Sequence, residues 1–70
     1  MNNGKEENLR ELFSEAKAIY SAMRYGAITY QEAKLKTTPL LNKLNAAAEI
    51  IAKKHNVKPK LIRFHDLGRG

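Results

Sequence analysis

The chain has 70 residues, a formal net charge of +6 and no cysteine. This length predicts one domain, residues 1–70, whose core is so small that tight helix packing or self-association has to supplement it. The lack of cysteine excludes disulfides and thiolate metal sites, and it suits a reducing compartment.

The N-terminus is polar, and no apolar run is long enough for a secretory signal or a membrane span. We therefore expect a cytoplasmic protein that is neither exported nor inserted in a membrane.

Positive charge is concentrated in the second half of the chain. Residues 1–33 hold four basic and five acidic side chains (4 − 5 = −1), whereas residues 34–70 hold nine basic and two acidic ones (9 − 2 = +7). A basic half can face phosphates or an acidic protein, and it can also serve solubility and complement helix ends. We favour the second interpretation.

The first predicted helix covers about residues 5–25. Its apolar residues follow one helical stripe: Leu9, Leu12, Phe13, Ala16, Ile19, Tyr20 and Met23. Three residues are candidates to begin it: Asn2, Asn3 and Gly4. Glu6 and Glu7 would then complement the helix dipole in the first turn, and Gly26 would end the helix in the left-handed region.

A tight corner follows the first helix. Thr29 and Glu32 fit a capping box, in which the Thr hydroxyl accepts from the N3 amide and the Glu side chain reaches back to the N-cap amide. Ile28 is placed for a hydrophobic staple with Ala33. One helix therefore ends and the next begins within a few residues, as in a helical hairpin.

The second helix contains Pro39, which allows two interpretations. Either Thr38 caps a new helix with Pro39 as its first residue, or one kinked helix runs from residue 30 to about 54. The apolar stripe keeps its phase through the proline: Ala33, Thr37, Leu40, Leu44, Ala47 and Ile51, widened by Leu41 and Ala48. This continuity favours the kinked helix.

The second helix is predicted to end near Lys53, Lys54 and His55, with Asn56 in the left-handed region and Pro59 preventing continuation. Leu61 or Ile62, with Phe64, can lie extended across the helices, and the three apolar residues together are expected to close one end of the hairpin. A short turn at residues 66–67 follows, and residues 1–4 and 68–70 should fray. The predicted fold is all-α, an antiparallel two-helix hairpin with a short extended or irregular C-terminal segment, and it is expected to self-associate.

Two groups of polar residues suggest chemistry, but each has a simpler interpretation. His65 and Asp66 are adjacent and have no accompanying nucleophile signature, so we interpret them as a tail histidine and a turn aspartate. His55, His65 and Glu49 match no zinc spacing. We therefore expect no catalytic, metal or cofactor site, no enzyme activity and no small-molecule substrate.

Two sets of residues are candidates for binding a macromolecule. The basic set could contact nucleic acid or an acidic partner: Lys53, Lys54, Lys58, Lys60 and Arg63. Tyr25 and Tyr30 bracket the corner and are candidate interface aromatics, although we favour rings that cover the hairpin corner.

The corner Gly26-Ala27-Ile28-Thr29-x-x-Glu32 resembles the turn of short helical-hairpin (SHOCT-type) domains. Three stretches together resemble small uncharacterised helical proteins of Gram-positive prophages and mobile elements: residues 28–34, Pro39-Leu40, and Ile51-Ala52-Lys53-Lys54 before the basic tail. The resemblance implies a small helical accessory protein.

Two hypotheses for function follow. The first is a non-enzymatic interaction or regulatory accessory module, a hairpin that self-associates or docks on a protein partner. The alternative is a nucleic-acid-binding accessory protein that uses the basic C-terminal half.

Overall fold

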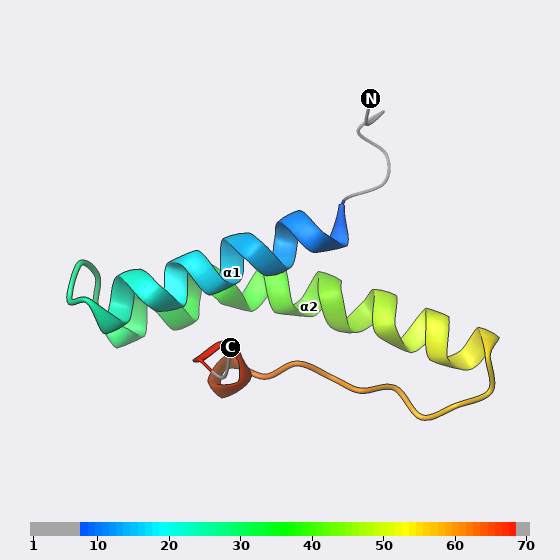
Figure 1. The fold of residues 1–70 in the computed structure, drawn as a ribbon. Helices are drawn as coiled ribbons and strands as arrows, with labels where there is room; N and C mark the ends of the chain where they lie inside the picture. The colour runs from blue at the N-terminus through cyan, green and yellow to red at the C-terminus, as the bar shows by residue number, and fades with distance from the viewer. Residues whose placement is uncertain (1–7, 69–70) are drawn as a thin grey trace.

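The computed structural model describes residues 8–68, which form two helices and a short 3₁₀ turn (Figure 1). Helix α1 spans Leu9–Arg24, helix α2 spans Tyr30–Lys54, and the turn η1 spans Phe64–Gly68. The two helices pack side by side in opposite directions, and the segment after α2 runs back so that η1 lies against both. The predicted all-α hairpin with a short C-terminal segment is confirmed.

Helix α1 begins at Leu9, so the predicted start near residue 5 is wrong. Asn8 is extended (φ −76°, ψ 110°), and its Oδ1 accepts hydrogen bonds from the amides of Arg10 (3.0 Å) and Glu11 (3.3 Å). Asn8 thus satisfies two amides that the first helical turn leaves without a partner. The residues predicted to begin the helix (Asn2, Asn3 or Gly4) and to complement its dipole (Glu6 and Glu7) lie outside the described part of the chain.

The corner between the helices has the predicted chemistry. Gly26 has φ +85°, and the amides of Gly26 and Ala27 donate to the carbonyls of Met23 (2.9 Å) and Ala22 (2.8 Å). This pair of bonds is the Schellman ending of a helix. Gly26 as the left-handed residue after α1 is therefore confirmed.

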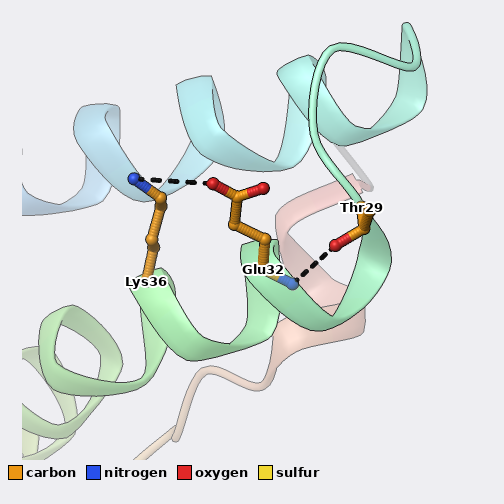
Figure 2. A network of polar contacts seen from close by, with 3 residues as sticks. All are labelled: Thr29, Glu32 and Lys36. Carbon is orange, nitrogen blue, oxygen red and sulfur yellow. Dashed lines mark hydrogen bonds and ion pairs between the residues drawn. The ribbon is translucent and has the colours of Figure 1, made fainter.

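Thr29 caps α2, and it forms half of the predicted capping box. Its hydroxyl oxygen accepts from the Glu32 amide at 3.0 Å, whereas the Glu32 carboxylate is directed toward Lys36, with Oε2 4.0 Å from Nζ (Figure 2). The carboxylate therefore supports the first turn of α2 through an i,i+4 pair instead of reaching back to the cap.

We expect Gly26→Val to lower the free energy of unfolding by about 1–2 kcal/mol, because an L-residue is strained in the left-handed region. A Cβ added at Gly26 has no heavy atom within 4 Å, so the cost arises from the backbone alone. Urea unfolding followed by circular dichroism measures it. Ala27→Val, at the exposed neighbouring residue, is the control. Equal stability of the two variants would contradict the positive φ.

Helix α2 continues through Pro39, as predicted. It is one helix of 25 residues, and the hydroxyls of Thr37 and Thr38 donate to the carbonyls of Ala33 (2.9 Å) and Lys34 (2.7 Å). The Thr38 hydroxyl acts as a donor within the helix and does not cap a new one. The competing interpretation of a helix break is therefore wrong, and the kink at Pro39 stays a prediction.

The end of α2 is also as predicted. Asn56 has φ +58°, and the amides of Asn56 and Val57 donate to the carbonyls of Lys53 (3.2 Å) and Ala52 (2.9 Å). Asn tolerates this conformation better than other residues with a side chain, which explains its position after the helix.

The core lies between the facing stripes of α1 and α2 and beneath η1. Its buried members are Leu12, Ala16, Ala33, Leu41, Leu44, Phe64 and Leu67. Thr37 is buried beside them, with its hydroxyl satisfied by the Ala33 carbonyl. The predicted stripes are therefore right near the corner, but they fail at their far ends, where Leu9 and Ile51 are exposed.

The C-terminal segment is attached by one side chain and one aromatic cluster. The Asn45 amide donates to the Ile62 carbonyl at 2.9 Å, and its Oδ1 accepts from the Ile62 amide at 2.7 Å. The Phe64 ring packs against Tyr20 and Tyr30, with centroids 5.1 and 5.4 Å apart. Ile62 and Phe64 therefore pack against the helices as predicted, whereas Leu61 is exposed. Only Ile62 lies in the extended stretch, because Phe64 is the first residue of η1.

We expect Asn45→Ala to lower the free energy of unfolding by about 1–3 kcal/mol, because both backbone groups of the half-buried Ile62 lose their partner. The Ile62 amide should also exchange its hydrogen faster. Asn42→Ala is the matched control, since Asn42 is exposed on the same helix. If the Ile62 amide exchanged equally fast in both variants, Asn45 would not hold the segment.

Candidate interaction surface

The end of α2 extends beyond the described start of α1. Helix α2 has 25 residues and α1 has 16, so nine residues, or about 14 Å at 1.5 Å per residue, have no α1 residue opposite them. In Figure 1 this part of α2 projects past the start of α1. Two large apolar side chains are exposed there, Ile50 by 68% and Ile51 by 51%.

Four residues of this region share one side of the helix. Ala47, Ile50, Ile51 and Lys54 stand at positions i, i+3, i+4 and i+7, which lie on one face of an α-helix. We call this set the α2 end face. Lys43, one turn before Ala47, follows the same face toward the corner. The end face is apolar from Ala47 to Ile51 and basic at Lys54.

Sequence reasoning missed this face because it assigned Ala47 and Ile51 to the buried stripe. The lengths of the two apolar stripes could have revealed this face. The apolar stripe of the first helix spans fewer turns than that of the second, so the last turns of the second helix lack residues to cover them.

The five basic candidates are all exposed. They are distributed over the end of α2 and the segment after it, and they do not gather on one element. Lys53 and Lys54 stand in the last turn of α2, and Lys58, Lys60 and Arg63 stand on the extended segment that follows it. Within residues 8–68 none of the five side chains forms an ion pair. Lys53 and Lys54 also complement the negative end of the helix dipole, which gives these two lysines a structural role.

The two tyrosines at the corner differ in their surroundings. Tyr25 is 88% exposed, so its ring does not cover the corner. Tyr30 is 49% exposed, and its ring meets Phe64 edge-on while Lys34 Nζ lies 5.7 Å from its centroid. Tyr30 therefore contributes to attaching the C-terminal segment, and Tyr25 is the more available of the two for contact with another molecule.

Of the two adjacent polar residues in the tail, Asp66 has a structural role. The Asp66 carboxylate accepts from the Arg63 amide at 2.9 Å and caps η1, while His65 is exposed. Among residues 8–68, no three histidine, aspartate or glutamate side chains lie close enough together to hold a metal ion. His55, His65 and Glu49 are thus not brought together in this part of the chain.

A shallow groove lies between α1 and the returning segment. It has a volume of about 430 Å³ and five lining residues: Phe13, Lys60, Leu61, Ile62 and Asp66. The half-buried Phe13 and the exposed Leu61 supply its apolar walls, and Lys17 Nζ lies 5.4 Å from the Phe13 ring. The groove is a second apolar feature of the surface, on different residues from the α2 end face.

Comparison of the chain with known protein families, curated proteins and solved structures finds no match. Within the described residues, no helix has the length and apolar character needed to cross a membrane.

Proposed function

We propose that this chain is a small non-enzymatic interaction module, a helical hairpin that presents the α2 end face to another protein. We also propose that it acts in the cytoplasm, the reducing compartment that suits a chain without cysteine. The observation that supports the first proposal is the exposure of Ile50 and Ile51 on a helix end that α1 does not cover. Contiguous apolar side chains on a protein surface are typical of interaction sites.

The difference in packing between the two parts of α2 also supports this function. Its first half packs against α1 and η1, whereas its last turns bury only one residue, Ala52. A helix end held by a Schellman ending yet lacking apolar cover is a rigid element with an available face. Rigid elements position interaction residues more accurately than loops do.

Sedimentation analysis over a concentration series tests whether a second copy is the partner. Under the self-association form of the proposal, the wild type should form a dimer that I50Q/I51Q abolishes. Leu35→Gln is the matched control, because Leu35 is 76% exposed on another part of α2 and its loss should leave the dimer intact. A dimer that all three proteins share would exclude the α2 end face as the interface, and a monomer throughout would require a different protein as partner.

A second candidate function, binding of nucleic acid, is favoured by one observation. The basic set Lys53, Lys54, Lys58, Lys60 and Arg63 is exposed and without ion pairs among residues 8–68. Cationic side chains that lack acidic neighbours can neutralise phosphates and release counterions. Binding of this kind is independent of base sequence and decreases steeply with salt.

Titration of duplex and single-stranded DNA or RNA at near-physiological salt tests this candidate. If nucleic acid is the partner, K58Q/K60Q/R63Q should weaken binding and flatten the slope of log affinity against log salt by about 0.9 per lost duplex phosphate contact. The control R10Q/R24Q/K36Q removes three positive charges elsewhere and should bind more tightly than the first triple variant. Absence of binding by the wild type at this salt would exclude the nucleic-acid function.

A further inference from the structure

We infer that the partner of the α2 end face is an acidic amphipathic helix of another protein. This inference rests on the function proposed above and adds the chemistry of the occupant. It is carried by three features of the same surface: its apolar centre, its small residues and the sign of the charge around it.

The shape of the face suits a helix. Ala47, Ile50 and Ile51 form a short apolar strip along one side of α2, and both isoleucines extend from it into solvent. The adjacent Ala46 is exposed and presents only a methyl group. Helices pack with axes about 8–10 Å apart, at the shorter end where side chains are small. A partner helix with large apolar residues at i, i+3, i+4 and i+7 can therefore lie beside the alanines and contact the isoleucines.

The charge around the face determines the kind of helix. Residues 43–60 contain five lysines and one glutamate, which gives 5 − 1 = +4 with histidine neutral. Lys54 stands at one end of the end face itself, and Lys53 is adjacent in the last turn. A partner with glutamates or aspartates flanking its apolar stripe would meet these lysines with complementary charge.

The same charge disfavours a second copy as occupant. Pairing two α2 end faces would bring two regions of +4 together, within about one Debye length at physiological salt. The two modes of binding therefore respond to salt in opposite directions. Association with an acidic helix should weaken as salt rises, whereas self-association through this face should strengthen.

A designed peptide serves as the probe. It is an amidated and acetylated helix of about 15–18 residues, long enough to be marginally helical alone, with leucines at i, i+3, i+4 and i+7 and glutamates at the flanking positions. A matched peptide carries lysine in place of every glutamate. Binding to the full chain is followed by amide chemical shifts and by anisotropy of a labelled peptide, at low and at near-physiological salt.

We expect the acidic peptide to bind, to shift the amides of residues 47–54, and to bind more weakly at the higher salt. I50Q/I51Q should weaken binding at least tenfold, whereas the control Leu35→Gln should change it less than twofold. K53Q/K54Q should weaken binding severalfold and reduce its salt dependence. All substituted side chains are exposed, so circular dichroism should show folded variants throughout.

Three results would overturn the inference: equal binding of the acidic and the basic peptide, shifts centred on residues other than 47–54, or no shift at millimolar peptide. A dimer that strengthens with salt and is abolished by I50Q/I51Q would make a second copy the occupant, which rejects the acidic helix but keeps the interaction function. Binding to vesicles of anionic lipid without binding to the peptide would reject both.

Discussion

We expect Leu44→Ala to lower the free energy of unfolding by about 2–5 kcal/mol, the usual cost of removing a buried leucine. Leu44 is buried on α2 in the cluster that contains Leu12 and Ala16 of α1, so its side chain joins the two helices. The core of a domain this small rarely contributes more than about 3–5 kcal/mol. Most of the population should therefore unfold, which far-UV circular dichroism during heating and in urea would show.

The matched control is Leu35→Ala, which removes the same atoms from the same helix. Leu35 is 76% exposed, so its loss creates no cavity and should change stability by about 0.5 kcal/mol or less. If the two variants lost equal stability, Leu44 would not lie in the packed interface of α1 and α2.

The features that the sequence predicted correctly are local ones. Gly26, Thr29 and Asn56 each determine a helix end through their own backbone or a hydroxyl a few residues away, so short stretches of sequence contain the necessary information. The continuity of α2 through Pro39 was visible in the unbroken phase of its stripe. These signals do not require knowledge of how the helices pack.

The sequence-based predictions were wrong in two situations. In one, several residues could begin the same helix; in the other, burial of a side chain depended on whether another helix packs over it. The N-terminal stretch contains more than one residue able to cap a helix, and only Asn8 marks the observed start of α1. Ile51 continues the helical phase of Ala33, but periodicity cannot show that α1 begins only at Leu9 and therefore does not extend along the last turns of α2. The same limitation concealed the apolar part of the candidate surface, whereas its lysines were recognised from composition.

The hydrogen bonds that attach the C-terminal segment to α2 could not be predicted from pattern. Asn45 lies in the middle of α2, where asparagine has no periodic meaning, and its partner Ile62 is 17 residues away. The Asn45 side chain bonds both the amide and the carbonyl of Ile62, as a neighbouring strand would do in a sheet. The predicted extended tail was right because Pro59 ends any helix, but its position on α2 required the fold.

We expect Phe64→Ala to lower the free energy of unfolding by about 3–5 kcal/mol, as for other buried phenylalanines. The Phe64 ring is buried between Tyr20 of α1 and Tyr30 of α2, and Lys34 Nζ lies 5.8 Å from its centroid. Its loss removes the contact that joins η1 to both helices at once. Leu67 alone would remain as a buried residue of η1, too little to hold the segment in place.

Near-UV circular dichroism should separate loss of this cluster from general unfolding, because Tyr20 and Tyr30 lose their fixed surroundings when Phe64 is removed. Under conditions where far-UV signal shows that helix is retained, the near-UV signal of the variant should be strongly reduced. Leu35→Ala is the control: Leu35 is 76% exposed on α2, so its truncation should leave both signals unchanged. A Phe64→Ala protein with wild-type stability and an intact near-UV spectrum would mean that η1 does not pack across the hairpin, and the position of the whole basic segment between α2 and η1 would have to be revised.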